Sequence, residues 1–188
     1  MTRCASFLPR RTWGIWVLLG LLWLAACTPA LDWREVRLGD SGLSGLFPCK
    51  PVSQTRRVRL GPDTVRLELH ACSADAATWA VAFAELDDPA RVGAALVALR
   101  DAAALNLSAS SAQPRALQIA GATPHPASQR VQLQGRMPDG RRVGAAVAVF
   151  ARGTRVFQAT VVSHGRDADA DADADATDNF FANLRFAS

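Results

Sequence analysis

Most of this chain alternates apolar and polar residues with a period of two, which is the pattern of strands whose sheet has one buried face. Residues 64–71 show it most clearly, because Val65, Leu67 and Leu69 are separated by polar residues. In residues 78–86, by contrast, the large apolar residues alternate only with alanine. A strand that is apolar on both faces is expected at the centre of a sheet covered on both sides. The predicted strands are residues 64–71, 78–86, 128–137, 141–151 and 154–162.

One segment follows the helical period instead. Asp88 is a suitable N-cap, and Pro89 fits the first helical position because the N–H that it lacks would have no intrahelical partner there. Apolar residues then recur at four-three-four spacing, which predicts a helix over residues 89–107. A short second helix is expected around Phe180 and Phe181, near the C-terminus. The apolar stripe of the long helix consists of Val92, Leu96, Leu99 and Ala103.

This order of elements predicts an α+β fold, in which an antiparallel sheet carries one long central helix and a short C-terminal helix. We expect a single domain over residues 33–188, with an aspartate–alanine loop at residues 167–176. A chain of this length is sufficient for one hydrophobic core.

The N-terminus has the features of a secretory leader. Arg3, Arg10 and Arg11 precede the apolar residues 13–24, and small residues follow at 25–26. Twelve apolar residues rise about 18 Å as a helix, which is short of the roughly 30 Å hydrocarbon core of a bilayer. A cleaved signal peptide over residues 1–26 is therefore expected rather than a retained membrane span.

The residues Leu24-Ala25-Ala26-Cys27 resemble the lipobox of bacterial lipoproteins, in which the cysteine becomes the lipid-modified first residue. The resemblance implies lipidation of Cys27 and a tether over residues 27–32. Thr28 follows where inner-membrane retention would favour aspartate, so the resemblance implies the periplasmic face of the outer membrane. Two or more acyl chains anchor a protein stably to the bilayer. The alternative is ordinary secretion with a free Cys27.

The net charge bears on whether the protein binds nucleic acid. The leader holds three basic residues and no acidic ones, so the net charge of the remainder is close to zero and no nucleic-acid partner is expected.

The four cysteines predict one disulfide. Cys4 lies in the leader, and Cys27 is assigned to the lipid. Cys49 and Cys72 then remain, and an oxidising compartment favours a disulfide between them. A redox-active thiol pair is the alternative, although the spacing is not C-x-x-C.

Two short motifs support a family resemblance. The residues GLFPCKP (45–51) follow a first strand, and DNFFANLRF (178–186) closes the chain. With the helix between them, they resemble an uncharacterised family of single-domain envelope lipoproteins from beta-proteobacteria. The resemblance implies a Mog1/PsbP-like α/β/α sandwich and an envelope location. It implies no activity and no catalytic residues.

The aspartate–alanine run has the ligand spacing of a calcium loop. An EF-hand-type loop that starts at Asp167 would use Asp169, Asp171 and Asp178 as further ligands. Ala172, however, stands where the sharp turn requires glycine, and no helix is predicted to enter the loop. The alternative, which these departures favour, is an extended solvated loop whose carboxylates repel one another.

A group of arginines forms the second candidate site. If the alternating segments lie as predicted, several arginines share an outward sheet face and would offer bidentate contacts to an anionic protein or glycolipid. The alternative is an ordinary solvated face, since any exposed strand needs polar residues. The candidate residues are Arg57, Arg59, Arg66, Arg130 and Arg136.

The sequence gives little support for a metal site, a catalytic nucleophile or a cofactor site. His70, His125 and His164 are far apart, so no metal site is expected beyond the calcium alternative. No nucleophile elbow is present, and no glycine-rich loop follows a strand and opens a helix, so no cofactor is expected.

These features together predict a non-enzymatic lipoprotein that acts as a binding or accessory module for a membrane-proximal protein or glycolipid. The alternative is a carrier of a small apolar or anionic ligand. Such a carrier would hold its ligand between helix and sheet, in a cavity near Ala80, Ala82 and Val147.

Overall fold

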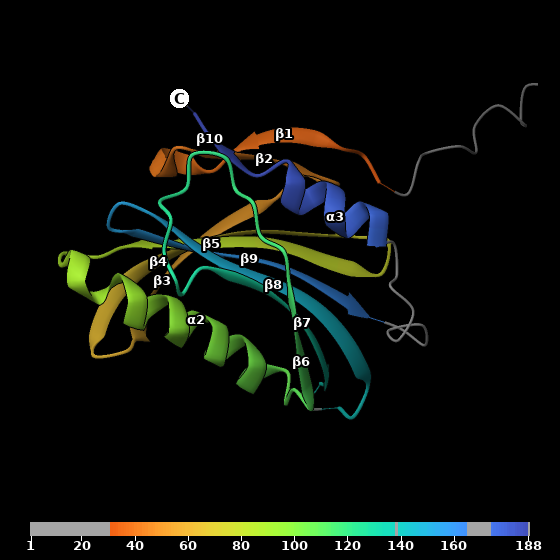
Figure 1. Cartoon of the computed structure of the whole chain (residues 1–188). Coiled ribbons are helices and arrows are strands. Elements are labelled where there is room, and N and C mark those ends of the chain that lie inside the picture. The colour runs from red at the N-terminus through yellow and green to blue at the C-terminus, as the bar shows by residue number, and fades with distance from the viewer. Residues whose placement is uncertain (1–30, 138, 165–173, 188) are drawn as a thin grey trace, which may run out of the picture. The chain divides into compact units, whose positions relative to one another are not determined.

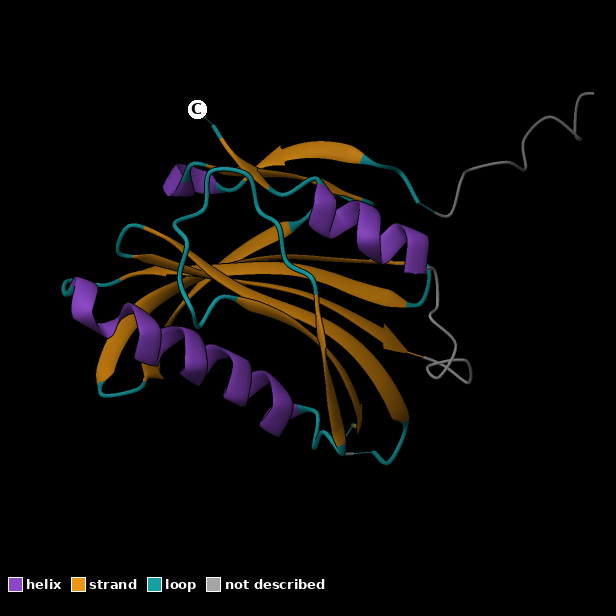
Figure 2. Ribbon diagram, in the orientation of Figure 1, coloured by secondary structure: helices purple, strands orange, loops and turns teal. Residues whose placement is uncertain are grey.

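The structure of the protein, a computed structural model, describes residues 31–137, 139–164 and 174–187. Strands dominate this part of the chain (Figure 2). In chain order the elements are β1 (Arg34–Arg37), the 3-10 turn η2 (Gly39–Ser41), β2 (Leu43–Phe47), β3 (Val52–Leu60), β4 (Asp63–Ala74), β5 (Ala77–Glu85), the 3-10 turn η3 (Pro89–Arg91), α2 (Val92–Asn106), β6 (Ser111–Arg115), β7 (Gln129–Arg136), β8 (Arg142–Arg152), β9 (Arg155–His164), α3 (Ala174–Ala182) and β10 (Arg185–Phe186).

The strands form two antiparallel sheets. The large sheet has the order β3-β4-β5-β9-β8-β7-β6, and the small sheet has the order β1-β2-β10. All five predicted strand segments are confirmed, as β4, β5, β7, β8 and β9. The doubly apolar β5 lies inside the large sheet between β4 and β9, as its pattern predicts.

Helix α2 covers one face of the large sheet (Figure 1). The predicted cap is present, because the Asp88 carboxylate accepts a hydrogen bond from the Ala90 N–H at 2.9 Å and Pro89 opens the turn η3. The α-helix itself begins directly after this turn, at Val92. The predicted stripe is also confirmed. Its residues are buried in one cluster with sheet residues such as Val147 and Val156.

The small sheet and α3 cover the other face of the large sheet (Figure 1). Aromatic rings fill this second core. Phe47 of the small sheet packs edge-on against Phe180 of α3 at a centroid distance of 5.2 Å, and Phe180 packs against Trp79 of β5 at 5.5 Å. The two cores lie on opposite faces of β5, which explains why that strand is apolar on both sides.

The predicted fold class is wrong. The described chain is mostly β, with two sheets, rather than an α+β sandwich of the Mog1/PsbP type. An α/β/α sandwich needs helical layers on both faces of its sheet, and here a long helix covers only one. The second layer is a three-stranded sheet with the short helix α3 beside it. It joins residues from both ends of the described chain, β1 and β2 with β10, and no local pattern reveals such a pairing.

Candidate functional site: arginines at the edge of the large sheet

The five candidate arginines do not form one continuous surface. Arg57 and Arg59 lie on β3 and Arg66 on β4, at one edge of the large sheet. Arg130 and Arg136 lie on β7, next to the opposite edge, with β5, β9 and β8 in between. Four strand spacings of about 4.8 Å separate β4 from β7, roughly 19 Å. The strand register does place all five on the same face of the large sheet, but at opposite edges of it, with the small sheet and α3 covering the middle.

The two arginines on β7 are held by local contacts. The Arg130 side chain is only 13% exposed, lies 4.3 Å from the centroid of the Phe181 ring, and donates to the Asp178 carboxylate at 2.6 Å. It thereby joins α3 to the large sheet. Arg136 donates to the Gly140 carbonyl at 3.2 Å, across the turn from β7 to β8. We assign both residues to the structure rather than to a binding surface.

The other three arginines form a compact group, which we call the edge triad: Arg57, Arg59 and Arg66. Arg57 pairs directly with Arg66 across the β3–β4 ladder, so both side chains point to the same face. Arg59 lies two residues beyond Arg57 and faces the same way. Directly opposed Cβ atoms lie about 5 Å apart and diagonal ones about 7–8 Å apart. Three positive charges thus stand within reach of a single anionic group.

No described carboxylate forms an ion pair with this triad. All three side chains are exposed, and none has a hydrogen bond or ion pair with another described residue. Carboxylates do lie close by. Glu68 is on the same face of β4, two residues from Arg66, and is bonded to His70 at 2.8 Å. Asp63, Glu85, Asp87 and Asp88 line a pocket together with Arg66, where Asp63 pairs with Arg91 and Glu85 accepts from Arg155 at 2.6 Å. Like charges directly opposed on neighbouring strands are destabilising, so the pair Arg57–Arg66 lowers stability unless an anion lies between them.

The predicted disulfide is present and fixes the other end of β3. Cys49 and Cys72 are bonded, with their Cα atoms 6.0 Å apart. Beside it, the Asp32 N–H donates to the Pro48 carbonyl at 2.9 Å, so the start of the described chain is held at this point. Arg57 lies five residues along β3 from Val52, about 17 Å for an extended strand. Edge strand β3 therefore runs from the entry of the chain to the triad.

Several predicted features lie outside the described residues. These are the leader (residues 1–26), the lipidation site Cys27, most of the tether, and the calcium candidates Asp167, Asp169 and Asp171. The fourth calcium candidate, Asp178, lies in α3 and pairs with Arg130. Within the described residues, no group of three or more His, Cys, Asp or Glu side chains is arranged to hold a metal ion. No helix in those residues is both long enough and apolar enough to cross a membrane.

The three histidines lie in separate places. His70 is buried and hydrogen-bonds Glu68 at 2.8 Å, while its ring stacks on Phe83. His164 lies 3.2 Å from the Thr78 hydroxyl, at the end of β9. The Nδ1 atom of His125 accepts from the Ala127 N–H at 3.0 Å. Each ring has a local structural contact, and the three do not converge.

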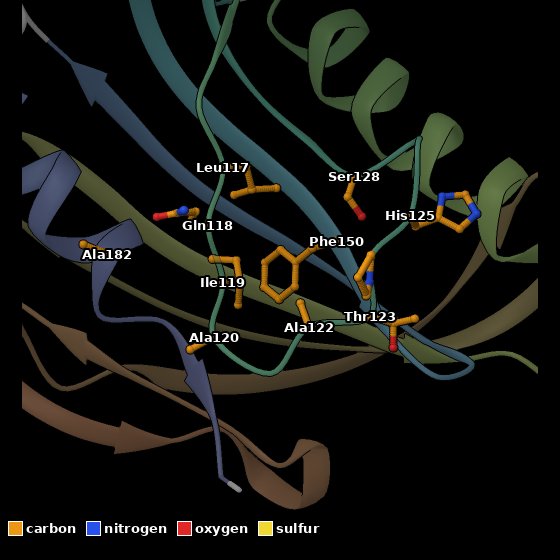
Figure 3. Close-up of a pocket in the computed structure, with 11 residues that line it drawn as sticks. Leu117, Gln118, Ile119, Ala120, Ala122, Thr123, His125, Ser128, Phe150 and Ala182 are labelled. Carbon is orange, nitrogen blue, oxygen red and sulfur yellow. The ribbon is translucent and has the colours of Figure 1, made fainter.

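A pocket of about 670 Å³, which the sequence did not predict, lies under the loop of residues 116–128 (Figure 3). Its floor is Phe150, which is 1% exposed, and Leu117 and Ile119 form one wall. The Ser128 hydroxyl oxygen on the other side is buried and has no hydrogen-bond partner in the described chain. The His125 ring turns away from Phe150, toward α2 (Figure 3).

The loop over this pocket is fixed at two points. The Ala120 carbonyl accepts from the Phe186 N–H at 2.9 Å, and the Thr123 N–H donates to the Ala151 carbonyl at 2.8 Å. The pocket is therefore preformed, as ligand pockets usually are. The predicted cavity near Val147 differs from it. Val147 is 1% exposed and belongs to the cluster of α2 side chains, so the helix packs over this residue.

Comparison with known proteins adds no assignment to these sites. No protein-family model matches the chain, and no curated protein matches its sequence.

Proposed function

We propose that the protein is a lipid-anchored envelope lipoprotein of the outer membrane, facing the periplasm, whose folded part binds an anionic partner at the bilayer surface. The partner is a membrane-proximal protein or a glycolipid. The role is that of a binding or accessory module rather than an enzyme. The lipobox supports the anchor, and the arginines of β3 and β4 support the anionic partner.

The observation that carries this proposal is the edge triad. Arg57, Arg59 and Arg66 are exposed and close together, and none of them forms an ion pair with a described carboxylate. Guanidinium groups bind phosphate and carboxylate oxygens in a bidentate manner. A phosphate-bearing glycolipid or an acidic protein segment would relieve the repulsion between the opposed arginines and gain such contacts.

The position of the triad relative to the anchor supports a partner near the membrane. The residues from Cys27 to Asp32 reach at most about 18 Å when fully extended. Asp32 is hydrogen-bonded to Pro48 near the start of β3, and the triad lies further along the same strand. With β3 lying along the bilayer, the triad would meet the headgroup layer.

A sedimentation assay tests the glycolipid form of this proposal. The chain from Thr28 onward, without lipid, would be mixed with zwitterionic vesicles that contain or lack a phosphate-bearing glycolipid. We expect sedimentation only with the glycolipid, decreasing with salt concentration. The triple variant Arg57→Gln, Arg59→Gln, Arg66→Gln should lose it.

The matched control replaces three exposed arginines elsewhere, Arg34, Arg115 and Arg141, and removes the same charge. Equal loss in both variants would show that net charge rather than the triad is responsible. Absence of any sedimentation would exclude the glycolipid and leave an acidic protein as the proposed partner.

The second candidate function is that of a small-ligand carrier, favoured by the preformed pocket over Phe150. Its lining suits an apolar ligand with one hydrogen-bonding group. An apolar fluorescent probe should gain intensity on binding, and Ala182→Trp, which fills the pocket, should abolish the gain. Ala102→Trp on the exposed side of α2 is the control. Equal probe binding in both variants would argue against the carrier.

A further inference from the structure

The pairing of the strands in the small sheet brings a second group of arginines together. In the order β1-β2-β10, Ser44 of β2 is the register partner of Arg37 on one side and of Arg185 on the other. Register partners in neighbouring strands point to the same face, so the three side chains form a row across the sheet. Two strand spacings place the arginine Cα atoms roughly 10 Å apart. Guanidinium groups on side chains of this length can meet over Ser44.

This row borders a pocket of about 420 Å³ at the end of the small sheet. Buried Leu43 and Phe186 contribute to its lining, and Gly39 and Gly42 form the turn beside it with positive φ values of 51° and 74°. The pocket volume lies within the range of small-molecule sites.

The strand on the far side of this pocket is held from two directions. The Phe186 N–H donates to the Ala120 carbonyl at 2.9 Å, and Arg152 donates to the Ala187 carbonyl at 3.2 Å. The Arg152 guanidinium also lies 4.9 Å from the centroid of the Phe186 ring. The pocket is therefore formed before any ligand enters.

The charges in the pocket leave one guanidinium without a partner. Arg185 donates to the Glu35 carboxylate at 2.7 Å, which holds its guanidinium over the outer face of the sheet. The Arg37 guanidinium has no hydrogen bond or ion pair with another described residue. Two arginines and one glutamate leave a single positive charge, next to the Ser44 hydroxyl. This set of groups is complementary to one anionic group with several oxygen atoms.

We propose that this pocket binds a small organic anion through its carboxylate or phosphate group. The anionic oxygens accept from Arg37 and Arg185. The Ser44 hydroxyl, which donates to the Arg185 carbonyl at 3.4 Å in the structure, turns to the ligand when it binds. Glu35 keeps Arg185 in place and is available to accept from a hydroxyl or ammonium group of the same ligand. The site is distinct from the edge triad, so it adds a ligand class to the proposed function and does not depend on it.

Titration of the full chain in a neutral detergent tests this inference by NMR. The probes are inorganic phosphate and acetate, added separately at constant ionic strength. We expect saturable shifts of the backbone amides of Gly42 and Ser44 with at least one probe. The probe that binds more tightly distinguishes a phosphate ligand from a carboxylate. Arg37→Gln should weaken this binding at least about tenfold, as expected for the loss of a charge-assisted contact.

Arg34→Gln is the matched control, because Arg34 is an exposed arginine of the same strand that pairs locally with Asp32. The control should leave both the affinity and the shifted residues unchanged. Linear shifts that never saturate, or equal weakening by Arg34→Gln, would overturn the site. The variant Ser44→Ala separates a specific site from general attraction, because it keeps the charge and should still weaken binding. Unchanged affinity in Ser44→Ala and Arg37→Gln would also overturn it.

Discussion

At the scale of single residues, the arginines of this protein divide by burial into two kinds. Arg130 is enclosed between Phe181 and Asp178, whereas Arg57 and its neighbours in the edge triad extend into solvent. A guanidinium that lies over a ring and pairs with a carboxylate contributes to stability. An exposed guanidinium opposite another one does not. We therefore expect substitution by glutamine to lower the free energy of unfolding at Arg130 but not at Arg57.

Arg130→Gln should lower the free energy of unfolding by about 1–3 kcal/mol, because it removes the ring contact and the ion pair that hold α3. Arg57→Gln should leave that free energy unchanged within about 0.5 kcal/mol, or raise it slightly, since it removes a like-charge pair. Urea unfolding of the two variants measures both values. A loss in Arg57→Gln as large as that in Arg130→Gln would show that the triad is structural.

Gly135 shows how closely β7 approaches the end of α2. A Cβ atom at this position would lie 2.1 Å from the Leu107 carbonyl oxygen, which accepts from the Arg136 N–H at 2.7 Å. Because the clash is with backbone, Gly135→Ala should cost about 2 kcal/mol or more in urea unfolding. Gly61→Ala is a useful comparison. It meets nothing within 4 Å but has a φ of 62°, so it should cost only about 1 kcal/mol. Equal costs would contradict the close approach.

At the scale of elements, local chemistry accounts for what the sequence predicts well. Asp88 and Pro89 determine the start of α2, and its apolar spacing determines which side is buried. Strand β3 was not among the predicted strands, because residues 52–57 are all exposed and carry no apolar alternation. It is a strand because β4 pairs with it over its whole length. Edge strands with one solvated face lack the signal that buried strands have.

The candidate sites, too, were predictable only where their residues lie close together in the sequence. Arg57 and Arg59 are recognisable from the sequence as arginines two residues apart, although no strand was predicted there. Their separation from Arg136 was not predictable, since it depends on the strand order of the large sheet. The row of Arg37, Ser44 and Arg185 leaves no signal at all in the sequence, because its members come from opposite ends of the described chain.

The disulfide joins the end of β2 to β4 and thus links the two sheets. It closes a loop with a sequence separation of 23 residues, for which the chain-entropy model predicts a stabilisation of about 3 kcal/mol. Replacement of both Cys49 and Cys72 by serine should therefore lower the melting temperature by roughly 6–12 °C. Thermal unfolding followed by circular dichroism measures the difference. An unchanged melting temperature would show that packing alone holds the sheets together.

At the scale of the whole molecule, two cores enclose one central sheet. Helix α2 covers one face, and the small sheet with α3 covers the other. Edge strand β3 contributes only Leu60 to the α2 core, with Val58 packed against it, and its residues 52–57 are exposed. The described chain begins beside the disulfide, where Asp32 is hydrogen-bonded to Pro48. Strand β3 begins near the same place and runs toward the edge triad. The exposed positive charge of β3 and β4 is thus fixed relative to the place where the proposed anchor enters the fold.

Photo-cross-linking in living cells tests this account most directly. A photoreactive residue would replace Thr55, which is exposed on the same face of β3 as Arg57 and Arg59. The comparison position is Leu105 on α2, which is 78% exposed.

We predict one dominant protein or glycolipid adduct from position 55, identified by mass spectrometry. That adduct should be absent from position 105 and lost in the Arg57→Gln, Arg59→Gln, Arg66→Gln variant. The same adducts from both positions, or none above background from position 55, would contradict the proposed binding role of the edge triad.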